Sequence, residues 1–404
     1  MSDHYDELET LDPGERERRQ FQALSERLRE AVAERPGLAR HLEGSDLDIG
    51  SRDALAKLPV LRKIDLMAAQ RENPPFGGFV ADGYAGRIFM SPGPVWEPEA
   101  AEASETARTL FAAGIRSGDR VHNALGYHMT PGGFILDVGA LALGCTVFPA
   151  GAGNTEAQVE AIAAYKPSAY LGTPDYLKTL LDAGAEAGRD LSSIRRAFVS
   201  GGALFPSMRA EYAERGVTVM QGYATADLGM VAYETATDGE VHEGMVCTEK
   251  AIVEIVRPGT GDPVADGEVG EIVVTSLSRN YPLFRFATGD LSKFLSGTSV
   301  DGRTNRRIAG WMGRADQRTK VKGMFVDPAQ VASVVRKTGL AAARLVVSRE
   351  GDGDAMELLY RGEAEAEAVA DALRSETGLR GTARRVEELP NDGKVIADER
   401  DYEG

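Results

Sequence analysis

The feature that most constrains the fold is a regular alternation between residues 119 and 224. Short β-type runs, such as CTVFPA and SAYLGT, are separated by helical stretches, such as NTEAQVEAIAAY and TPDYLKTLLDAGAEAG. This alternation predicts a doubly wound, mostly parallel α/β sheet. Ligands of such sheets bind beyond the carboxyl ends of the strands. We therefore expect the chemistry in three loops, GYHMTPGG (126–133), SGGALF (200–205) and GYATADLG (222–229).

The pattern changes after Glu249. The runs KAIVEIVRP, EIVVTSL and YPLFRFATGDLSKFL come one after another without helices, which predicts an antiparallel β subdomain. From Arg314, two helical stretches set among strands predict a small α+β domain. A chain of 404 residues also favours two domains, because single cores rarely exceed ~250–300 residues. We therefore expect an α/β N-terminal domain over residues 1–313, which includes the antiparallel subdomain, and a mobile C-terminal α+β domain over residues 314–404.

Charge and composition argue against several classes of protein. The formal net charge of −16 opposes binding of nucleic acid. No apolar run approaches the ~20 residues of a membrane-spanning helix, and the charged start resembles no secretory signal, so we expect a cytoplasmic protein. Cys145 and Cys247 lack partners at metal-ligand spacing. Dimers are the commonest assembly, so a homodimer is one expected form, and the sequence leaves the oligomeric state open.

Three short motifs in a fixed order carry the strongest functional signal. They are RFATGDL (285–291), GRADQRTKVKG (313–323) and NDGKVI (391–396). Together they resemble the nucleotide and hinge signatures of adenylate-forming enzymes, and their details look most like phenylacetate-CoA ligases. Stretches from LPVLRKIDL to GMFVDPAQV support a resemblance that runs from about residue 58 to 400. The resemblance implies that ATP activates a carboxylic acid, expected to be aryl or arylacetic, to an acyl-adenylate, which then passes to coenzyme A with release of AMP.

The same resemblance implies roles for four charged residues. Asp290 resembles the aspartate whose carboxylate accepts hydrogen bonds from the ribose hydroxyls, and Arg314 the arginine that steadies ribose and phosphate. Lys394 resembles the catalytic lysine, a cation that stabilises the charge developing as the acid attacks the α-phosphate. Asp316 resembles the hinge about which the small domain turns. Without the companion motifs, a turn aspartate and solvated surface charges would be the simpler explanations.

The loop after one predicted strand resembles the adenine-binding loop of the family. It consists of Ser200, Gly201, Gly202 and Ala203, and its glycines would let a flat base lie against the backbone. A strand-to-helix turn that needs glycine for its dihedral angles is the other explanation, and both can hold.

The stretch GYATADLG resembles the YGxTE motif of the family. Tyr223 and Ala224 would then lie against the adenine, and Asp227 would take the place of the glutamate that binds Mg²⁺. Two departures accompany this resemblance. The carboxylate is one methylene shorter, and Ala226 replaces a threonine that donates a hydrogen bond to the α-phosphate.

The phosphate loop departs further from the family. Where the family has a run like SSGTTGKP, this chain reads RIFMSPGPVWEPE. Pro92 and Pro94 remove two amide donors from the phosphate cradle. Ser91 and Gly93 are the remaining phosphate contacts that we expect, and a simple proline turn before a helix that begins near Glu97 is the alternative.

Two further groups of residues are expected at the substrates, again by resemblance. The substrate pocket would be lined by Tyr127, Gly132, Gly133 and Phe134. The coenzyme A tunnel would be lined by Lys320, Lys322 and Gly323. Phe134 as a core residue and the lysines as solvated side chains are the alternatives.

Two other functions stay open from the sequence. The acyl group could pass to a carrier-protein thiol or an amine instead of coenzyme A. Alternatively, the chain could be a non-catalytic nucleotide- or acyl-CoA-binding member of the fold, since its phosphate loop has lost donors. The sequence does not identify the carboxylic acid.

Overall fold

The computed structural model describes residues 4–91, 94–202, 204–237, 239–317, 319–321, 324–350, 353–390 and 394–400. The chain forms two compact units. Unit 1 comprises Met1–Glu268, Ile272–Thr288 and Lys293–Gly310, and unit 2 comprises Val269–Glu271, Gly289–Ser292 and Trp311–Gly404. The domain boundary expected between residues 313 and 314 stays a prediction.

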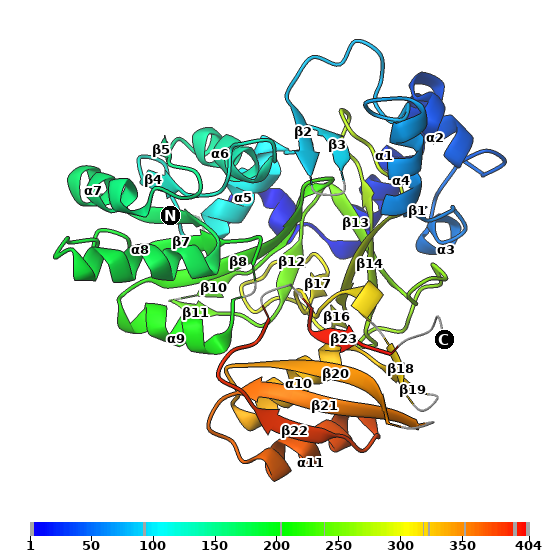
Figure 1. The fold of residues 1–404 in the computed structure, drawn as a ribbon. Helices are drawn as coiled ribbons and strands as arrows, with labels where there is room; N and C mark the ends of the chain where they lie inside the picture. The colour runs from blue at the N-terminus through cyan, green and yellow to red at the C-terminus, as the bar shows by residue number, and fades with distance from the viewer. Residues whose placement is uncertain are drawn as a thin grey trace. The chain divides into compact units, whose positions relative to one another are not determined.

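The largest sheet of unit 1 has the order β16-β17-β12-β9-β8-β7-β6-β4-β5 (Figure 1). Its parallel half confirms the predicted alternation and consists of β4 (Arg120–Asn123), β5 (Thr146–Pro149), β6 (Ala169–Gly172), β7 (Arg196–Val199) and β8 (Thr218–Thr225). Its antiparallel half consists of β9 (Gly229–Tyr233), β12 (Met245–Cys247), β16 (Phe294–Leu295) and β17 (Arg307–Ile308).

Helices cover both faces of the parallel half, as a doubly wound sheet requires. Leu171 and Phe198 are buried in one cluster with residues of α5 (Ala103–Ala112) and α6 (Gly132–Ala142). Tyr170 and Val199 are buried in another with residues of α7 (Thr155–Tyr165), α8 (Pro174–Glu186) and α9 (Pro206–Glu214). Successive strand residues point to opposite faces, so one strand supplies both clusters. The carboxyl ends of β7 and β8 therefore meet at one edge of a rigid sheet.

A second sheet of unit 1 has the order β1-β15-β14-β13. Its strands are β1 (Leu61–Arg62), β13 (Ala251–Val256), β14 (Gly270–Ser276) and β15 (Phe286–Ser292), and the last of them continues into unit 2. The N-terminal helices are α1 (Pro13–Glu34), α2 (Pro36–His41), α3 (Arg52–Leu55) and α4 (Lys63–Glu72). Phe21, Leu24 and Leu28 recur on one face of α1 and are buried in the same core as this sheet. Asp12 caps α1 by accepting a hydrogen bond from the Glu15 amide at 3.0 Å.

The segment before α5 is a hairpin. β2 (Ile88–Ser91) and β3 (Val95–Pro98) pair antiparallel, with Phe89 opposite Glu97 and Ser91 opposite Val95. The expectation of a helix that begins near Glu97 is therefore wrong, because Glu97 lies within β3 and α5 begins at Ala103. The segment after the prolines pairs with β2 and is therefore a strand, where the sequence suggested a helix.

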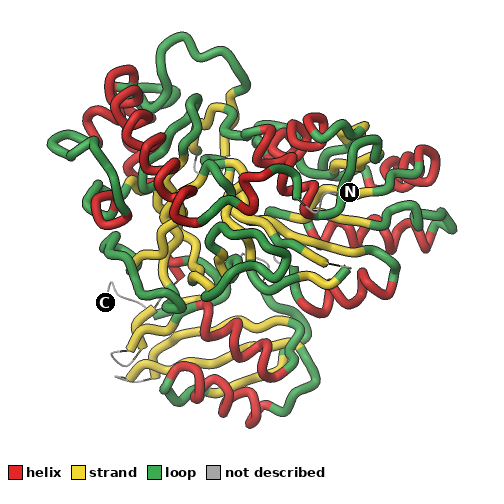
Figure 2. The backbone as a smooth tube through the Cα atoms, turned by 180° about the vertical axis from the view of Figure 1, so that it is seen from behind, coloured by secondary structure: helices red, strands yellow, loops and turns green. Residues whose placement is uncertain are grey.

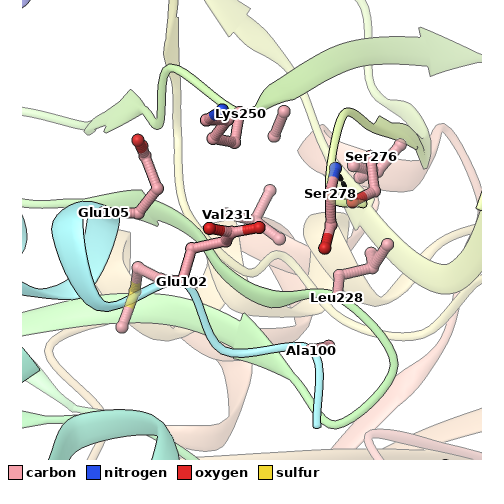
Figure 3. A pocket seen from close by; sticks show the side chains of 11 residues that line it. Ala100, Glu102, Glu105, Leu228, Val231, Lys250, Ser276 and Ser278 are labelled. Carbon is pink, nitrogen blue, oxygen red and sulfur yellow. Dashed lines mark hydrogen bonds between the residues drawn. The ribbon is translucent and has the colours of Figure 1, made fainter. Parts of the chain in front are cut away.

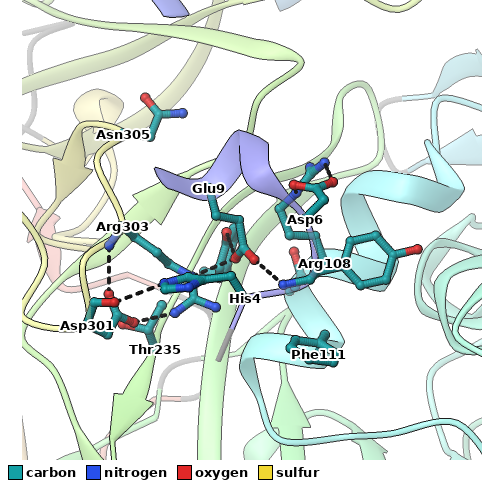
Figure 4. A network of polar contacts seen from close by, with 12 residues as sticks. His4, Asp6, Glu9, Arg108, Phe111, Thr235, Asp301, Arg303 and Asn305 are labelled. Carbon is teal, nitrogen blue, oxygen red and sulfur yellow. Dashed lines mark hydrogen bonds and ion pairs between the residues drawn. The ribbon is translucent and has the colours of Figure 1, made fainter. Parts of the chain in front are cut away.

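A buried polar network holds the N-terminal segment to the body of unit 1 (Figure 4). Glu9, in the 3-10 helix η1 (Glu7–Thr10), receives a hydrogen bond from Arg303 Nε at 2.6 Å and one from the Tyr233 hydroxyl at 3.2 Å. Its side chain is fully buried, and that of Arg303 is 3% exposed. The short strands β10 (Ala236–Thr237) and β11 (Glu240–Val241) form a separate ribbon.

Unit 2 contains a four-stranded sheet with the order β22-β21-β20-β23. These strands are β20 (Ala342–Glu350), β21 (Gly353–Arg361), β22 (Thr382–Arg385) and β23 (Ile396–Asp398). Two helices, α10 (Pro328–Thr338) and α11 (Ala366–Thr377), cover one face of it (Figure 2). A second ribbon consists of β18 (Thr319–Val321) and β19 (Met324–Val326), after the 3-10 helix η2 (Ala315–Gln317).

Within the described residues, no helix combines the length and apolar character needed to cross a bilayer. Cytoplasmic location and a homodimer stay predictions.

Candidate active site

The loop after β7 exposes backbone at the carboxyl edge of the large sheet. Ser200 is tied to the next strand, since its hydroxyl donates to the Gly222 carbonyl at 2.9 Å. Gly201 has a φ of 71°, a conformation that disfavours residues with a Cβ. Gly201 and Gly202 are both exposed, which leaves a surface without side chains beside the strand end. The loop has the form expected of both an adenine platform and a glycine turn, and Ala203 lies outside the described residues.

The neighbouring strand β8 carries an irregularity at Tyr223 and Ala224. Its pairing with β9 shifts register between these two residues. Such bulges re-aim side chains and are common beside active sites. Tyr223 is 7% exposed, so its ring is largely packed, and the backbone after it departs from the regular ladder at the sheet edge. The two residues therefore lie next to the Ser200 loop, because Ser200 bonds the residue before Tyr223.

Asp227 lies in the turn between β8 and β9 and is 3% exposed. Its Oδ2 atom accepts a hydrogen bond from Lys63 Nζ at 3.2 Å, and the two side chains form an ion pair. Its Oδ1 atom is buried and has no hydrogen-bond partner among the residues that the structure describes. A buried carboxylate oxygen without a partner is a suitable ligand for a hard cation, so Asp227 fits the Mg²⁺ role that the resemblance implies.

The expected phosphate contact Ser91 is already engaged. Its hydroxyl donates to Glu97 Oε2 at 2.6 Å across the β2–β3 hairpin. Glu97 is fully buried, and the sequence between the two strands, Pro92 to Pro94, contains no serine or threonine. Gly93, the other expected contact, lies outside the described residues. The segment expected to be the phosphate loop thus lies between two paired strands, and one of them, β3, carries a buried acidic side chain.

Glu97 was not identified from the sequence as a site residue. Burial, and then the charge of Asp227, raise the pKa of Glu97 to about 8, against the opposing effects of the Ser91 hydrogen bond and of Lys63. Lys63 Nζ lies 4.0 Å from Glu97 Oε1. The only sequence signal was an acidic residue among the apolar neighbours of a short strand. The structure therefore places one lysine and two carboxyl groups from distant segments in one buried cluster.

Two of the four residues expected in the acid pocket, Tyr127 and Phe134, belong to an aromatic cluster. The rings of Tyr127 and Phe134 meet edge to face, with centroids 5.0 Å apart, and Phe89 of β2 lies 5.5 Å from Phe134. A Cβ added at Gly133 would lie 2.8 Å from the Tyr127 ring, whereas one added at Gly132 would meet nothing closer than 3.8 Å. The space that Gly133 leaves is therefore filled by the protein's own tyrosine.

A hydrogen-bonded pair fixes the orientation of that tyrosine. Asn123 Nδ2 donates to the Tyr127 hydroxyl at 2.8 Å, and the hydroxyl donates to Asp137 Oδ1 at 3.3 Å. Burial is the main cause that raises the pKa of Tyr127 well above 10, so the phenol stays protonated. Tyr127 can thus present an aromatic face in one orientation.

Unit 2 brings the expected ribose residues together. Asp290 and Arg314 form a backbone bridge, and Arg314 Nη1 donates to Asp290 Oδ1 at 3.4 Å. Trp311, which the sequence did not single out, donates its indole N–H to the same oxygen at 3.0 Å. Gly289 permits this arrangement, since a Cβ there would lie 2.8 Å from the Arg314 guanidinium. Two donors therefore hold the carboxylate of Asp290 in place.

The catalytic candidate Lys394 lies just before β23 and is exposed. The amide of the next residue, Val395, donates to the Gln317 side chain at 2.7 Å. Gln317 ends η2 and comes directly after the expected hinge residue Asp316. The backbone that carries Lys394 is thus tied to the hinge segment through a glutamine that sequence reasoning missed.

The residues expected at coenzyme A are only partly visible. Lys320 lies in β18, paired with β19, and its side chain is not described. Lys322 and Gly323 lie outside the described residues. Their role stays a prediction.

A small pocket of unit 1 is lined by residues of the segment after β3, of α5 and of the strands β9, β13 and β14 (Figure 3). Glu102, Lys250, Leu228 and Ser276 are among its lining residues. Its volume of about 10 Å³ holds roughly one water molecule. It is too small for an aryl ring or a nucleotide, so it is not the substrate site.

Comparison with known proteins places this geometry among related enzymes. A family model described as "AMP-binding enzyme" matches residues 139–278. The chain is 32% identical to the phenylacetate-coenzyme A ligase of Thermus thermophilus over 372 residues, which is 87% of this chain and 82% of that protein. It is also 32% identical to the enzyme of the same name from Aromatoleum evansii over 339 residues, or 80% of this chain and 74% of that protein.

A solved structure shares the fold. The crystal structure of 2-hydroxyisobutyryl-CoA ligase in the postadenylation state, in complex with 2-HIB-AMP, matches with a TM-score of 0.82 and 24% identity. The match covers 98% of this chain and 93% of that one. The anthranilate CoA ligase AuaEII in complex with anthranoyl-AMP matches with a TM-score of 0.54 and 18% identity, over 76% of this chain and 64% of that chain.

Proposed function

This chain belongs to the phenylacetate-coenzyme A ligase family, and we propose that it activates an aryl or arylacetic acid with ATP and transfers the acyl group to coenzyme A. The reaction has two steps. The carboxylate attacks the α-phosphate of ATP, which forms an acyl-adenylate and releases pyrophosphate. The thiol of coenzyme A then attacks the acyl carbon and releases AMP.

The observation that carries this proposal is the held carboxylate of Asp290. A ribose needs an acceptor in a fixed position, and Trp311 and Arg314 both donate to one oxygen of Asp290. Their two hydrogen bonds orient the carboxylate before a nucleotide arrives. Preorganisation of this kind lowers the cost of binding. The loop at Gly201 and Gly202 would receive the adenine, with Tyr223 beside it.

For the first step we assign the catalytic charge to Lys394. Two anions must meet while negative charge develops on phosphorus, and a cation between them stabilises that state. Loss of one such charge costs on the order of 10²–10³ in rate. Gln317 holds the backbone beside Lys394 and so limits where its ammonium can reach. A Mg²⁺ ion held by Asp227 would supply further positive charge at the phosphates.

For the second step we propose that the small domain turns about Asp316. This turn would withdraw Lys394 and bring the segment of Lys320, Lys322 and Gly323 to the pantetheine arm. Lid and domain motions of this kind let one site perform two reactions in sequence.

For the acid, we propose an aromatic ring as the side chain of the substrate. Tyr127, Phe134 and Phe89 form a cluster of rings at the start of α6 and on the adjoining hairpin. Aromatic pairs prefer edge-to-face or offset contacts, and the half-buried rings of Tyr127 and Phe134 would receive a further ring in this way.

The test is formation of acyl-CoA and AMP. The full chain is incubated with ATP, Mg²⁺, coenzyme A and a panel of benzoic, phenylacetic and aliphatic acids, and the products are identified by mass spectrometry. An aryl-CoA formed in step with AMP is the expected result. AMP formation and acyl-adenylate without any thioester would instead favour a carrier-protein thiol or an amine as acceptor.

One observation favours a second candidate function. The segment expected to be the phosphate loop has lost amide donors to two prolines, and its serine is bonded to Glu97. A non-catalytic nucleotide- or acyl-CoA-binding protein would tolerate both changes. Calorimetry that finds AMP binding, together with no acid-dependent release of pyrophosphate for any acid in the panel, would establish this second function and exclude the ligase.

A further inference from the structure

Seven buried side-chain oxygen atoms of unit 1 lack a hydrogen-bond partner among the residues that the structure describes, and three of them belong to side chains that lie close together. These three are Oε1 of Glu97, Oδ1 of Asp227 and the hydroxyl of Tyr281. Glu97 is fully buried, Tyr281 is 1% exposed and Asp227 is 3% exposed. Buried polar atoms in folded proteins are almost always paired with protein, water or an ion.

The three side chains share one place in the fold. Lys63 Nζ lies 3.2 Å from Asp227 Oδ2 and 4.0 Å from Glu97 Oε1, so it connects the two carboxyl groups. Tyr281 is fully buried, and after burial the charges of Asp227 and Glu97 are what raise the pKa of its phenol. The phenol therefore lies within electrostatic range of both. Ser91 faces the same group, through its hydrogen bond to Glu97.

The charges of this cluster match a divalent cation. When Glu97 is ionised, the two carboxylates bring two negative charges, and Lys63, whose side chain is 39% exposed, supplies one positive charge from the solvent side. Mg²⁺ prefers oxygen ligands and keeps several of its waters, and proteins typically bind it with one or two carboxylates together with the phosphates of the substrate. The described residues contain no group of three or more His, Cys, Asp or Glu side chains that could hold a metal ion, so the proposed site consists of two carboxylates and water.

We propose that Glu97 and Asp227 together bind one Mg²⁺ ion through Glu97 Oε1 and Asp227 Oδ1, with the Tyr281 hydroxyl bonded to a water of that ion. This inference deepens the proposed function and rests on it for the use of the metal. In the related motif one carboxylate serves the ion, whereas here the hairpin of β2 and β3 supplies a second. The ion would then hold the pyrophosphate part of ATP in place of the lost amides.

The test is metal binding without nucleotide. Mn²⁺ is titrated into the full chain and free Mn²⁺ is measured by electron paramagnetic resonance, with Mg²⁺ as competitor. The wild type is expected to bind one Mn²⁺ that Mg²⁺ displaces. Glu97→Gln keeps the side-chain shape and an acceptor for Ser91, and it is expected to raise the Mn²⁺ dissociation constant at least about tenfold.

The matched control is Glu99→Gln, which removes a carboxylate two residues away that pairs with Arg87 and not with the cluster. It is expected to bind Mn²⁺ like the wild type. Circular dichroism checks that each variant is folded. Absence of a Mg²⁺-displaceable site in the wild type, or equal binding by wild type and folded Glu97→Gln, overturns the inference.

The same experiment separates this inference from the proposed function. If Glu97→Gln binds Mn²⁺ like the wild type and the wild type makes acyl-CoA, Glu97 is not a metal ligand but the proposed ligase function stands. If Mn²⁺ binds as expected but the protein activates no acid, the proposed metal site stands and the proposed ligase function is wrong.

Discussion

Replacement of Glu97 by glutamine should make the protein less sensitive to alkaline pH. In the folded protein the pKa of Glu97 is about 8, against an ordinary value of 4.5, because the carboxyl group is buried beside Asp227. A carboxyl group with a raised folded pKa costs no stability below its unfolded pKa, and the cost grows as the pH rises toward the folded pKa. Between pH 6 and pH 8 the wild type should therefore lose about 2 kcal/mol of unfolding free energy through this group alone.

The assay is urea unfolding at constant ionic strength, with EDTA present, for wild type and Glu97→Gln. The difference in unfolding free energy between them should widen in favour of the variant from pH 6 to pH 8, since all other groups titrate alike in both. Glu99→Gln provides the matched control, and its curve should run parallel to that of the wild type. Parallel curves for Glu97→Gln as well would refute the assignment of a buried, protonated carboxyl group.

Three other predictions rest on single contacts. Trp311→Phe removes the indole donor to Asp290 and should raise KM for ATP by roughly 3–10-fold with kcat nearly unchanged, as initial rates would reveal. Gln317→Ala frees the backbone beside the catalytic lysine and should slow acid-dependent ATP–pyrophosphate exchange more than thioester formation from a supplied acyl-adenylate; equal slowing would count against this role. Glu9→Gln removes one of the two carboxylates that pair with the buried Arg303, while Asp301 stays, and should cost about 1–3 kcal/mol in urea unfolding, whereas an unchanged unfolding free energy would contradict a contribution of this ion pair.

The fold of the central sheet could be predicted because its signals are local. Each strand from β4 to β8 is a short apolar run, and each intervening helix has its own periodicity, so the order of elements alone implied parallel strands with helices on both faces. The α+β character of the C-terminal region was visible for the same reason.

The hairpin at Glu97 could not be predicted, because its cause is not local. The prolines of SPGP indicated a turn but not the structure of the segment after it, which becomes β3 by pairing with β2. The environment of Glu97 depends on Asp227, Tyr281 and Lys63, which come from distant parts of the chain. A pattern of residue types along the chain carries no information about such a meeting.

The substrate residues show a different limit. Gly133 was expected to line the substrate pocket, and the structure has the ring of Tyr127 in the space beside it. A glycine in the sequence can indicate that another group lies close to the backbone in the folded protein. The sequence does not say whether that group is a ligand or one of the protein's own side chains. Trp311 is a site residue that the sequence did not indicate. Its contact with Asp290 accompanies the backbone bridge between Asp290 and Arg314, which no sequence pattern reveals.

The central claim is that this chain activates a carboxylic acid with ATP through the charge of Lys394. The most direct measurement is acid-dependent ATP–pyrophosphate exchange with an aryl acid from the panel, for wild type and Lys394→Ala, beside thioester formation from the matching acyl-adenylate and coenzyme A. We predict exchange in the wild type, a loss on the order of 10²–10³ in Lys394→Ala, and nearly equal thioester formation in both. Equal loss of the two half-reactions in the variant, or exchange that persists without the lysine, would contradict the account.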